Sequence, residues 1–147
     1  MQVRDIMTES MAFVPPEKTL GEIARMMVEC DCGAVPVVDP QTQKAVGIVT
    51  DRDIVCRAVA SGRDPAGVRA DDIMTTPLTA VRPEDSVEQC VAEMERARVR
   101  RMPVIDDRGR LCGIVSQADI ARAAPPAETG HLVHDLSEPA GHAPRAQ

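Results

Sequence analysis

The sequence predicts a mixed α/β (α+β) fold of two similar units packed with pseudo-twofold symmetry. Three observations support this. The tetrapeptide Asp5–Thr8 (Asp-Ile-Met-Thr) returns 67 residues later as Asp72–Thr75. Similar apolar runs, helical periodicity and turn residues follow each copy. The chain has 147 residues, so neither half can bury a full core alone. We therefore expect the halves to pack together, with the function in the cleft between them.

The repeat continues well past this tetrapeptide. At the same spacing Val14, Pro16, Glu17 and Pro36–Asp39 match Val81, Pro83, Glu84 and Pro103–Asp106, and at a spacing of 66 Gly47–Thr50, Asp53 and Ile54 match Gly113–Ser116, Asp119 and Ile120. A duplication of this length predicts that each copy forms one supersecondary unit.

The first copy opens with a short predicted strand at Met11–Val14, which Pro15 and Pro16 end. A helix follows, because Thr19 is a suitable N-cap and Glu22 completes a capping box three residues later. Its predicted buried face consists of Leu20, Ile23, Ala24 and Met27, which recur at helical spacing.

Two apolar runs then predict a β-hairpin of buried strands. They are Ala34–Val38 and Ala45–Val49, separated by the polar stretch Asp39–Lys44. A second helix is expected to start after Thr50 and to end near Gly62. The residues that this helix turns inward are predicted to be Ile54, Val55 and Ala58.

The second copy repeats this order after a polar linker at 63–71. Leu78–Val81 is a predicted strand, and Ser86 with Gln89 forms the capping box of the next helix. The remaining predicted elements are a hairpin of Met102–Ile105 and Leu111–Val115, and a last helix from Gln117 to about Ala124. We therefore divide the sequence into repeat 1 at 1–66, repeat 2 at 67–124 and a tail at 125–147.

The tail at 125–147 is predicted to be disordered, since it is rich in proline and has no apolar periodicity. All three histidines lie in it, so the two repeats contain none.

Composition excludes several classes of partner. The net charge is −6 and is spread along the chain rather than gathered in a block, which argues against nucleic acid as the main partner, because neutralising phosphates requires a basic face. With one Phe and no Tyr or Trp, stacking platforms for unpaired bases are also missing. No apolar run approaches the roughly 20 residues that span a bilayer, and no signal-peptide pattern is present. We therefore expect a cytoplasmic protein that does not bind membranes.

Each hairpin leads into its following helix through one motif, glycine-x-x-hydroxyl-x-x-aspartate. The hydroxyl and the acid are Thr50 and Asp53 in the first copy and Ser116 and Asp119 in the second. One interpretation is a capping box, a common local motif. The other is a nucleotide site, because a hydroxyl can bind a phosphate oxygen and an aspartate can accept hydrogen bonds from both ribose hydroxyls. The presence of the whole motif in both copies favours the second interpretation.

These residues identify the chain as similar to a tandem pair of cystathionine-β-synthase (CBS) domains, also called a Bateman module. The resemblance covers about residues 1–124. It rests on Asp-Ile-Met-Thr, on apolar-Pro-Val-apolar-Asp and on the glycine-hydroxyl-aspartate motif, each present twice. The stretch Val46–Val55, with Gly62–Pro65, is similar to small stand-alone bacterial CBS-pair proteins, including the hypoxic response type.

The resemblance implies two βαββα-like units that form a homodimer and bind an adenosyl ligand, namely AMP, ADP, ATP or S-adenosylmethionine. By matching position, Asp53 and Asp119 would bind ribose, and Thr50 and Ser116 would bind phosphate or ribose oxygens. The residues that would line the adenine pocket are Val35, Pro36, Met102 and Pro103.

Arg101, two residues before Pro103, would reach the phosphates. The first copy departs from the family pattern here, because it has Ala34 at the equivalent position. Arg52 or an arginine of the other copy would have to substitute.

The five cysteines do not predict a metal site. Cys30 and Cys32 have the wrong spacing for zinc, and the repeats offer no histidine partner. Four cysteines, Cys30, Cys32, Cys90 and Cys112, align with apolar residues of the other copy, so we expect them in the core. Cys56 aligns with Arg122 and is the expected exposed thiol.

We therefore predict a regulatory, ligand-sensing module that signals to an unidentified effector protein. An enzyme is not expected, because no nucleophile-base arrangement is present. The alternative is a stress-related structural or protein-interaction dimer whose clefts bind no ligand.

Overall fold

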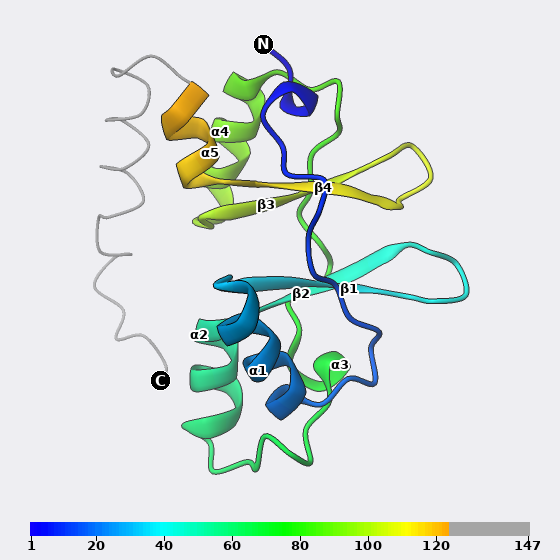
Figure 1. The fold of residues 1–147 in the computed structure, drawn as a ribbon, viewed down its shortest axis with the longest axis vertical. Coiled ribbons are helices and arrows are strands. Elements are labelled where there is room, and N and C mark those ends of the chain that lie inside the picture. The colour runs from blue at the N-terminus through cyan, green and yellow to red at the C-terminus, as the bar shows by residue number, and fades with distance from the viewer. Residues whose placement is uncertain (124–147) are drawn as a thin grey trace. The chain divides into compact units, whose positions relative to one another are not determined.

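The computed structural model describes residues 1–123. The predicted tail and the three histidines lie outside the described residues. The chain forms two compact units (Figure 1). One is the continuous segment Ala12–Leu78, and the other combines Met1–Met11 with residues 79–123. We call them the central unit and the terminal unit.

Each unit contains a long helix, a two-stranded hairpin and a further helical stretch in that order, together with one short helix that comes last in the central unit and first in the terminal unit. The central unit consists of α1 (Leu20–Cys30), β1 (Ala34–Val38), β2 (Ala45–Thr50), α2 (Asp51–Asp53), the π-helix η2 (Ile54–Val59) and α3 (Ala70–Ile73). The terminal unit consists of the 3₁₀-helix η1 (Val3–Asp5), α4 (Val87–Ala97), β3 (Arg101–Ile105), β4 (Leu111–Ser116) and α5 (Gln117–Ala123). The mixed helix-and-strand fold with an internal repeat is thus confirmed.

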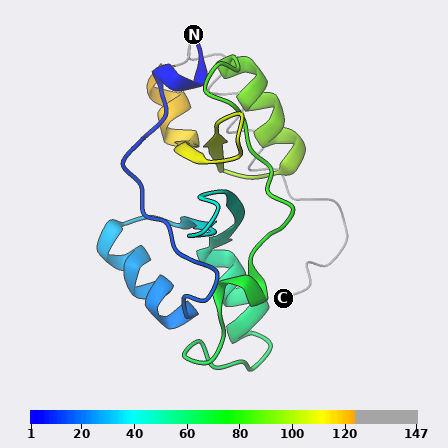
Figure 2. The same cartoon turned by 90° about the vertical axis from the view of Figure 1, so that its right-hand side faces the viewer.

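Each unit is built on an antiparallel hairpin, as the apolar runs predicted. In β1–β2 Pro36 lies opposite Ile48, and in β3–β4 Pro103 lies opposite Ile114. Helices cover one face of each hairpin: α1 and α2 in the central unit, and α4 and α5 in the terminal unit (Figures 1 and 2). A separate hydrophobic core lies beneath the helices of each unit.

The helix starts follow their predicted caps with one exception. Ser86 and Gln89 form the full capping box of α4, with bonds of 2.8 and 3.1 Å. At α1 the Thr19 hydroxyl accepts from the Glu22 amide at 3.4 Å. The Glu22 carboxylate instead pairs with Lys18 at 3.0 Å, which lowers the pKa of Glu22, so the predicted box is only half formed.

The two short strands predicted at Met11–Val14 and Leu78–Val81 are wrong. Each is reduced to one isolated parallel bridge, Val14 with Val37 and Val81 with Val104. Val14 donates to the Pro36 carbonyl and accepts from the Val38 amide, at 3.0 and 2.8 Å. The prolines that follow have no N–H, so the pairing cannot continue into a strand.

The helix after Thr50 differs from its prediction in winding. Beyond Asp53 it continues as the π-helix η2, and Ala60 donates to the Val55 carbonyl at 2.8 Å. A π-helix bonds residue i to i+5, so its residues are turned less about the axis than in an α-helix. Ile54 and Ala58 are buried as expected, but Val55 is 57% exposed, so its predicted inward position is wrong.

The Asp-Ile-Met-Thr segment of each sequence repeat packs in the unit that holds the other repeat's hairpin. Thr8 exchanges backbone hydrogen bonds with Ile114 of β4, at 2.9 and 3.0 Å. Thr75 does the same with Ile48 of β2, at 2.9 and 3.3 Å. The compact units are therefore offset from the sequence repeats.

The glycine of the repeated motif makes this packing possible. A Cβ added at Gly113 would lie 2.9 Å from both the Met7 sulfur and the Thr8 carbonyl oxygen. A Cβ at Gly47 would lie 2.6 Å from the Met74 sulfur. Only a residue without a side chain allows the segment to approach the hairpin so closely.

We predict that Gly113→Ala lowers the free energy of unfolding by about 1–3 kcal/mol, because the Thr8 backbone must move away from β4. Denaturant unfolding measures the change. Gly67→Ala is the matched control, since the nearest atom to its Cβ would be 3.8 Å away. Equal stability of Gly113→Ala and the control would contradict the packing role.

Candidate functional site

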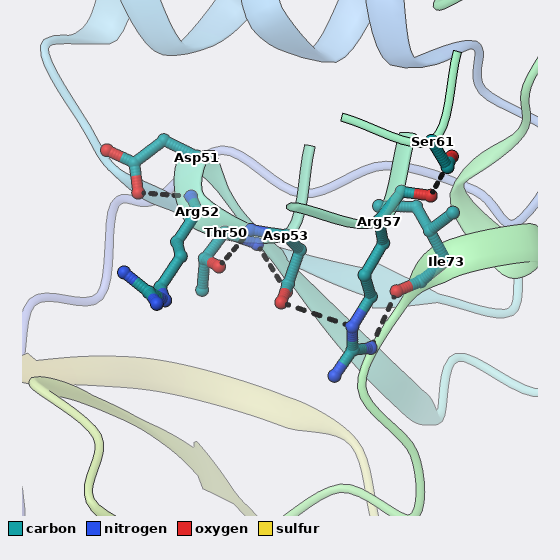
Figure 3. Close-up of polar contacts among 7 residues, drawn as sticks. All are labelled: Thr50, Asp51, Arg52, Asp53, Arg57, Ser61 and Ile73. Atoms are coloured by element: carbon teal, nitrogen blue, oxygen red, sulfur yellow. Dashed lines mark hydrogen bonds and ion pairs between the residues drawn. The ribbon is translucent and has the colours of Figure 1, made fainter. Parts of the chain in front are cut away.

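The first candidate site is the junction between β2 and α2, where the capping box is fully formed (Figure 3). The Thr50 hydroxyl accepts from the Asp53 amide, and the Thr50 amide donates to Asp53 Oδ2, both at 3.0 Å. The Thr50 hydroxyl keeps its own proton for donation to another group.

The junction between β4 and α5 repeats this geometry. The Ser116 hydroxyl accepts from the Asp119 amide at 3.1 Å, and the Ser116 amide donates to Asp119 Oδ2 at 2.8 Å. The Ser116 hydroxyl also lies 2.9 Å from Asp119 Oδ2 and can donate to it. The structural interpretation of the motif is therefore correct in both copies.

Capping does not exhaust the acceptor capacity of the two aspartates. A carboxylate offers about four lone-pair positions. The box occupies Oδ2 of each residue, and Oδ1 faces an arginine. The Asp53 and Asp119 side chains are 13% and 7% exposed, so both carboxylates are nearly buried. A nearly buried carboxylate with unused lone pairs is suited to accept hydroxyl hydrogen bonds.

Two arginines that the sequence interpretation missed hold these carboxylates. Arg57 Nε lies 3.7 Å from Asp53 Oδ1, and its Nη1 donates to the Ile73 carbonyl at 2.9 Å. Arg122 donates to Asp119 Oδ1. Their spacing from the aspartates, i+4 and i+3, is the helical ion-pair signal that could have identified them.

The hairpin register brings Arg101 to the second junction. Arg101 is the strand partner of Ser116, just as Ala34 is the partner of Thr50. The Gln117 amide also donates to the Arg100 carbonyl at 2.9 Å, which holds the start of β3 against the start of α5. Arg101 and Ser116 are therefore neighbours across the hairpin at the start of this junction.

The charges around the two junctions differ. Residues Arg98, Arg100 and Arg101 precede β3 or begin it, whereas the equivalent positions before β1 carry Asp31, Gly33 and Ala34. Within residues 1–123 the three arginine side chains make no hydrogen bond or ion pair. Arg101 is partly buried, and Arg98 and Arg100 are exposed.

The predicted adenine-lining residues occupy two different environments. Val35 and Met102 have no exposed surface, and each belongs to the core of its unit. Pro36 and Pro103 are also buried, and strand alternation points them to the opposite face of their hairpins. Any ligand contact at Val35 or Met102 must therefore use the main chain.

The cysteines occupy sites that only partly match their prediction. Cys90 is fully buried, and Cys32 and Cys112 pack against the two cores. Cys30, at the end of α1, is exposed, so its predicted core position is wrong, and Cys56 is only partly exposed. Burial raises the pKa of Cys90 to about 12. Among residues 1–123 no group of three or more His, Cys, Asp or Glu side chains is arranged to hold a metal ion.

Comparison with known proteins identifies the family. The CBS domain description matches twice, at residues 3–59 and 70–125. The chain belongs to the CBS domain family. It is 38% identical over 122 residues to hypoxic response protein 1 of Mycobacterium tuberculosis, covering 83% of this chain and 84% of that protein. It matches an uncharacterized protein of Methanopyrus kandleri, MK0525, with 38% identity, but spans only 59% of its length.

Solved CBS structures resemble the chain as well. The structure of Hypoxic Response Protein I with two coordinated zinc ions has a TM-score of 0.77 and 38% identity, covering 85% of this chain and all (100%) of that one. The CBS pair of MJ0100 in complex with 5′-methylthioadenosine and S-adenosylmethionine has a TM-score of 0.73 and 27% identity, covering 83% and 94%. CBSX2 in complex with AMP has a TM-score of 0.72 and 26% identity, covering 83% and 94%. No helix in the described part of the chain is long and apolar enough to cross a membrane.

We predict that Cys30 reacts fastest with a thiol reagent and Cys90 slowest. Raising the Cys90 pKa from 9.0 to about 12 lowers its thiolate fraction roughly a thousandfold at pH 8, because the thiolate is the reacting form. Mass spectrometry of timed samples measures each site. The same experiment in denaturant is the control and should equalise the two rates. Rapid labelling of Cys90 in the folded protein would contradict its burial.

Proposed function

We propose that this protein is a cytoplasmic regulatory module that binds an adenosyl ligand at its strand-helix junctions. The duplicated pair of nearly buried carboxylates, Asp53 and Asp119, is the observation that carries the proposal. Each is held in place by its own helix start, and each has at least one lone pair left for a ribose hydroxyl. The ligands named for the MJ0100 and CBSX2 structures, which share an adenosyl group, support this ligand class.

The roles of the remaining site residues follow from their positions. The hydroxyls of Thr50 and Ser116 would bind phosphate or ribose oxygens. Pro36 and Pro103 would border the adenine, with Val35 and Met102 contributing main-chain groups. Arg101 would bind phosphate at the second junction, where it lies opposite Ser116 in the hairpin register.

The proposed role is binding and regulation, without catalysis. We infer instead that ligand binding alters how the protein, as a homodimer, engages an effector protein. The mass of the protein in solution, measured by sedimentation, checks the dimer directly.

Ligand binding should appear as thermal stabilisation by AMP, ADP, ATP or S-adenosylmethionine. A ligand at 100 times its dissociation constant adds about 2.7 kcal/mol to the free energy of unfolding. We expect Asp53→Ala to abolish the stabilisation that ligand binding at the first junction contributes. Asp119→Ala should abolish the stabilisation that the second junction contributes. GTP serves as the control ligand. If none of the adenosyl ligands stabilises the wild-type protein, the alternative of an interaction dimer without ligands replaces this proposal.

Arg101 should make the second junction selective for ligands that carry phosphate. We predict that Arg101→Ala weakens AMP and ATP binding about tenfold, the loss of one partly exposed charged hydrogen bond, and leaves S-adenosylmethionine unaffected. Titration calorimetry of the Asp53→Ala background isolates this junction. Arg108→Ala, in the exposed hairpin turn, is the charge-matched control. Equal losses for AMP and S-adenosylmethionine would refute a phosphate contact.

A further inference from the structure

One arginine connects the first junction to the end of the central unit. Arg57 projects from η2, with its Nε 3.7 Å from Asp53 Oδ1 and its Nη1 bonded to the Ile73 carbonyl at 2.9 Å (Figure 3). Ile73 is the last residue of α3. A single guanidinium therefore joins the carboxylate of the proposed ligand site to a residue that lies 16 positions after the arginine in the chain.

The segment that Arg57 contacts is the exit of the central unit. After Ile73, the amides of Met74 and Thr75 donate to the carbonyls of Ala70 and Ile48, each at 2.9 Å. The chain leaves this unit after Leu78 and enters the terminal unit. Any change in the position of Arg57 therefore acts on the segment that leads to one of the two covalent connections between the units.

In the described part of the terminal unit, the arginine pairs with the aspartate but makes no bond to the backbone of the corresponding segment. Arg122 bonds to Asp119 there, as Arg57 pairs with Asp53. Among the residues that the structure describes, however, Arg122 makes no hydrogen bond to the equivalent segment around Met7 and Thr8. The amides of Met7 and Thr8 donate to the carbonyls of Val3 and Ile114 at 3.0 and 2.9 Å. Arg122 is therefore a natural control for Arg57 within the same chain, because it shares the pairing with an aspartate but not the bond to the backbone.

We propose that Arg57 is a positioning residue that couples ligand occupancy at Asp53 to the segment Ile73–Thr75. This inference rests on the proposed function of the junction. A ligand that binds Asp53 in its observed orientation favours that orientation over all others. It therefore also stabilises the contacts that maintain the orientation, including the bond from Arg57 to Ile73. Because such coupling is reciprocal, loss of Arg57 weakens ligand binding as well.

The test is amide hydrogen exchange of the full chain, measured by NMR with and without a saturating probe. The probes are AMP and S-adenosylmethionine, in the Asp119→Ala background so that only the first junction can bind. We expect the probe to slow exchange at Met74 and Thr75. In Arg57→Gln this slowing should disappear, and the affinity should fall roughly fivefold, the size of one net hydrogen bond.

Two further variants separate coupling from general stability. Arg57→Lys keeps the charge but has no planar fork to bridge two acceptors, so it should retain more affinity than Arg57→Gln while losing the slowing. This milder variant also serves if Arg57→Gln does not fold. In the Asp53→Ala background, Arg122→Gln should leave any ligand-dependent slowing at Met7 and Thr8 unchanged.

The outcomes are distinct. If the probe binds and slows Met74 and Thr75 equally with and without Arg57, the coupling is wrong and the proposed function stands. If neither probe stabilises the wild-type protein, the proposed function is wrong and the coupling falls with it.

Discussion

The close contact between each Asp-Ile-Met-Thr segment and a β-hairpin is the constraint on which the rest of the structure depends. Thr8 and Thr75 each exchange two backbone hydrogen bonds with a hairpin residue. The bonds can form only because Gly113 and Gly47 leave room for the neighbouring methionine and the backbone carbonyl. Each segment belongs by sequence to one repeat but packs against the hairpin of the other repeat. Backbone hydrogen bonds therefore connect the two repeats.

The same glycines stand at the start of the functional motif, which explains why a single short pattern serves two purposes. The glycine admits the linking segment, and the hydroxyl and the aspartate begin the helix that follows. A capping box fixes both side chains through backbone amides, so their geometry is set before any ligand arrives. Capping and binding are therefore compatible uses of the motif, because a site on a rigid helix start loses little freedom when it binds.

The sequence predicted local elements well and long-range contacts poorly. Both hairpins, the helices after Thr19 and Ser86 and the two junction boxes follow from periodicity and caps, which are properties of neighbouring residues. The pairing of Thr8 with Ile114 joins residues far apart in the chain and has no local signal. The contact of Arg57 with Ile73 was missed for the same reason. Val55 was misplaced because nothing in the local pattern distinguishes a π-helix from an α-helix.

The two junctions combine one geometry with two electrostatic environments. Their hydrogen-bond distances within the box agree closely, since both are set by the same strand-to-helix register. Their charges do not agree, because Arg101 stands where the other copy has Ala34. Exposed charges such as Arg98 and Arg100 are largely screened by salt, whereas a partly buried charge opposite Ser116 is screened much less. If the junctions bind ligands as proposed, a difference in ligand preference between them would depend mainly on Arg101.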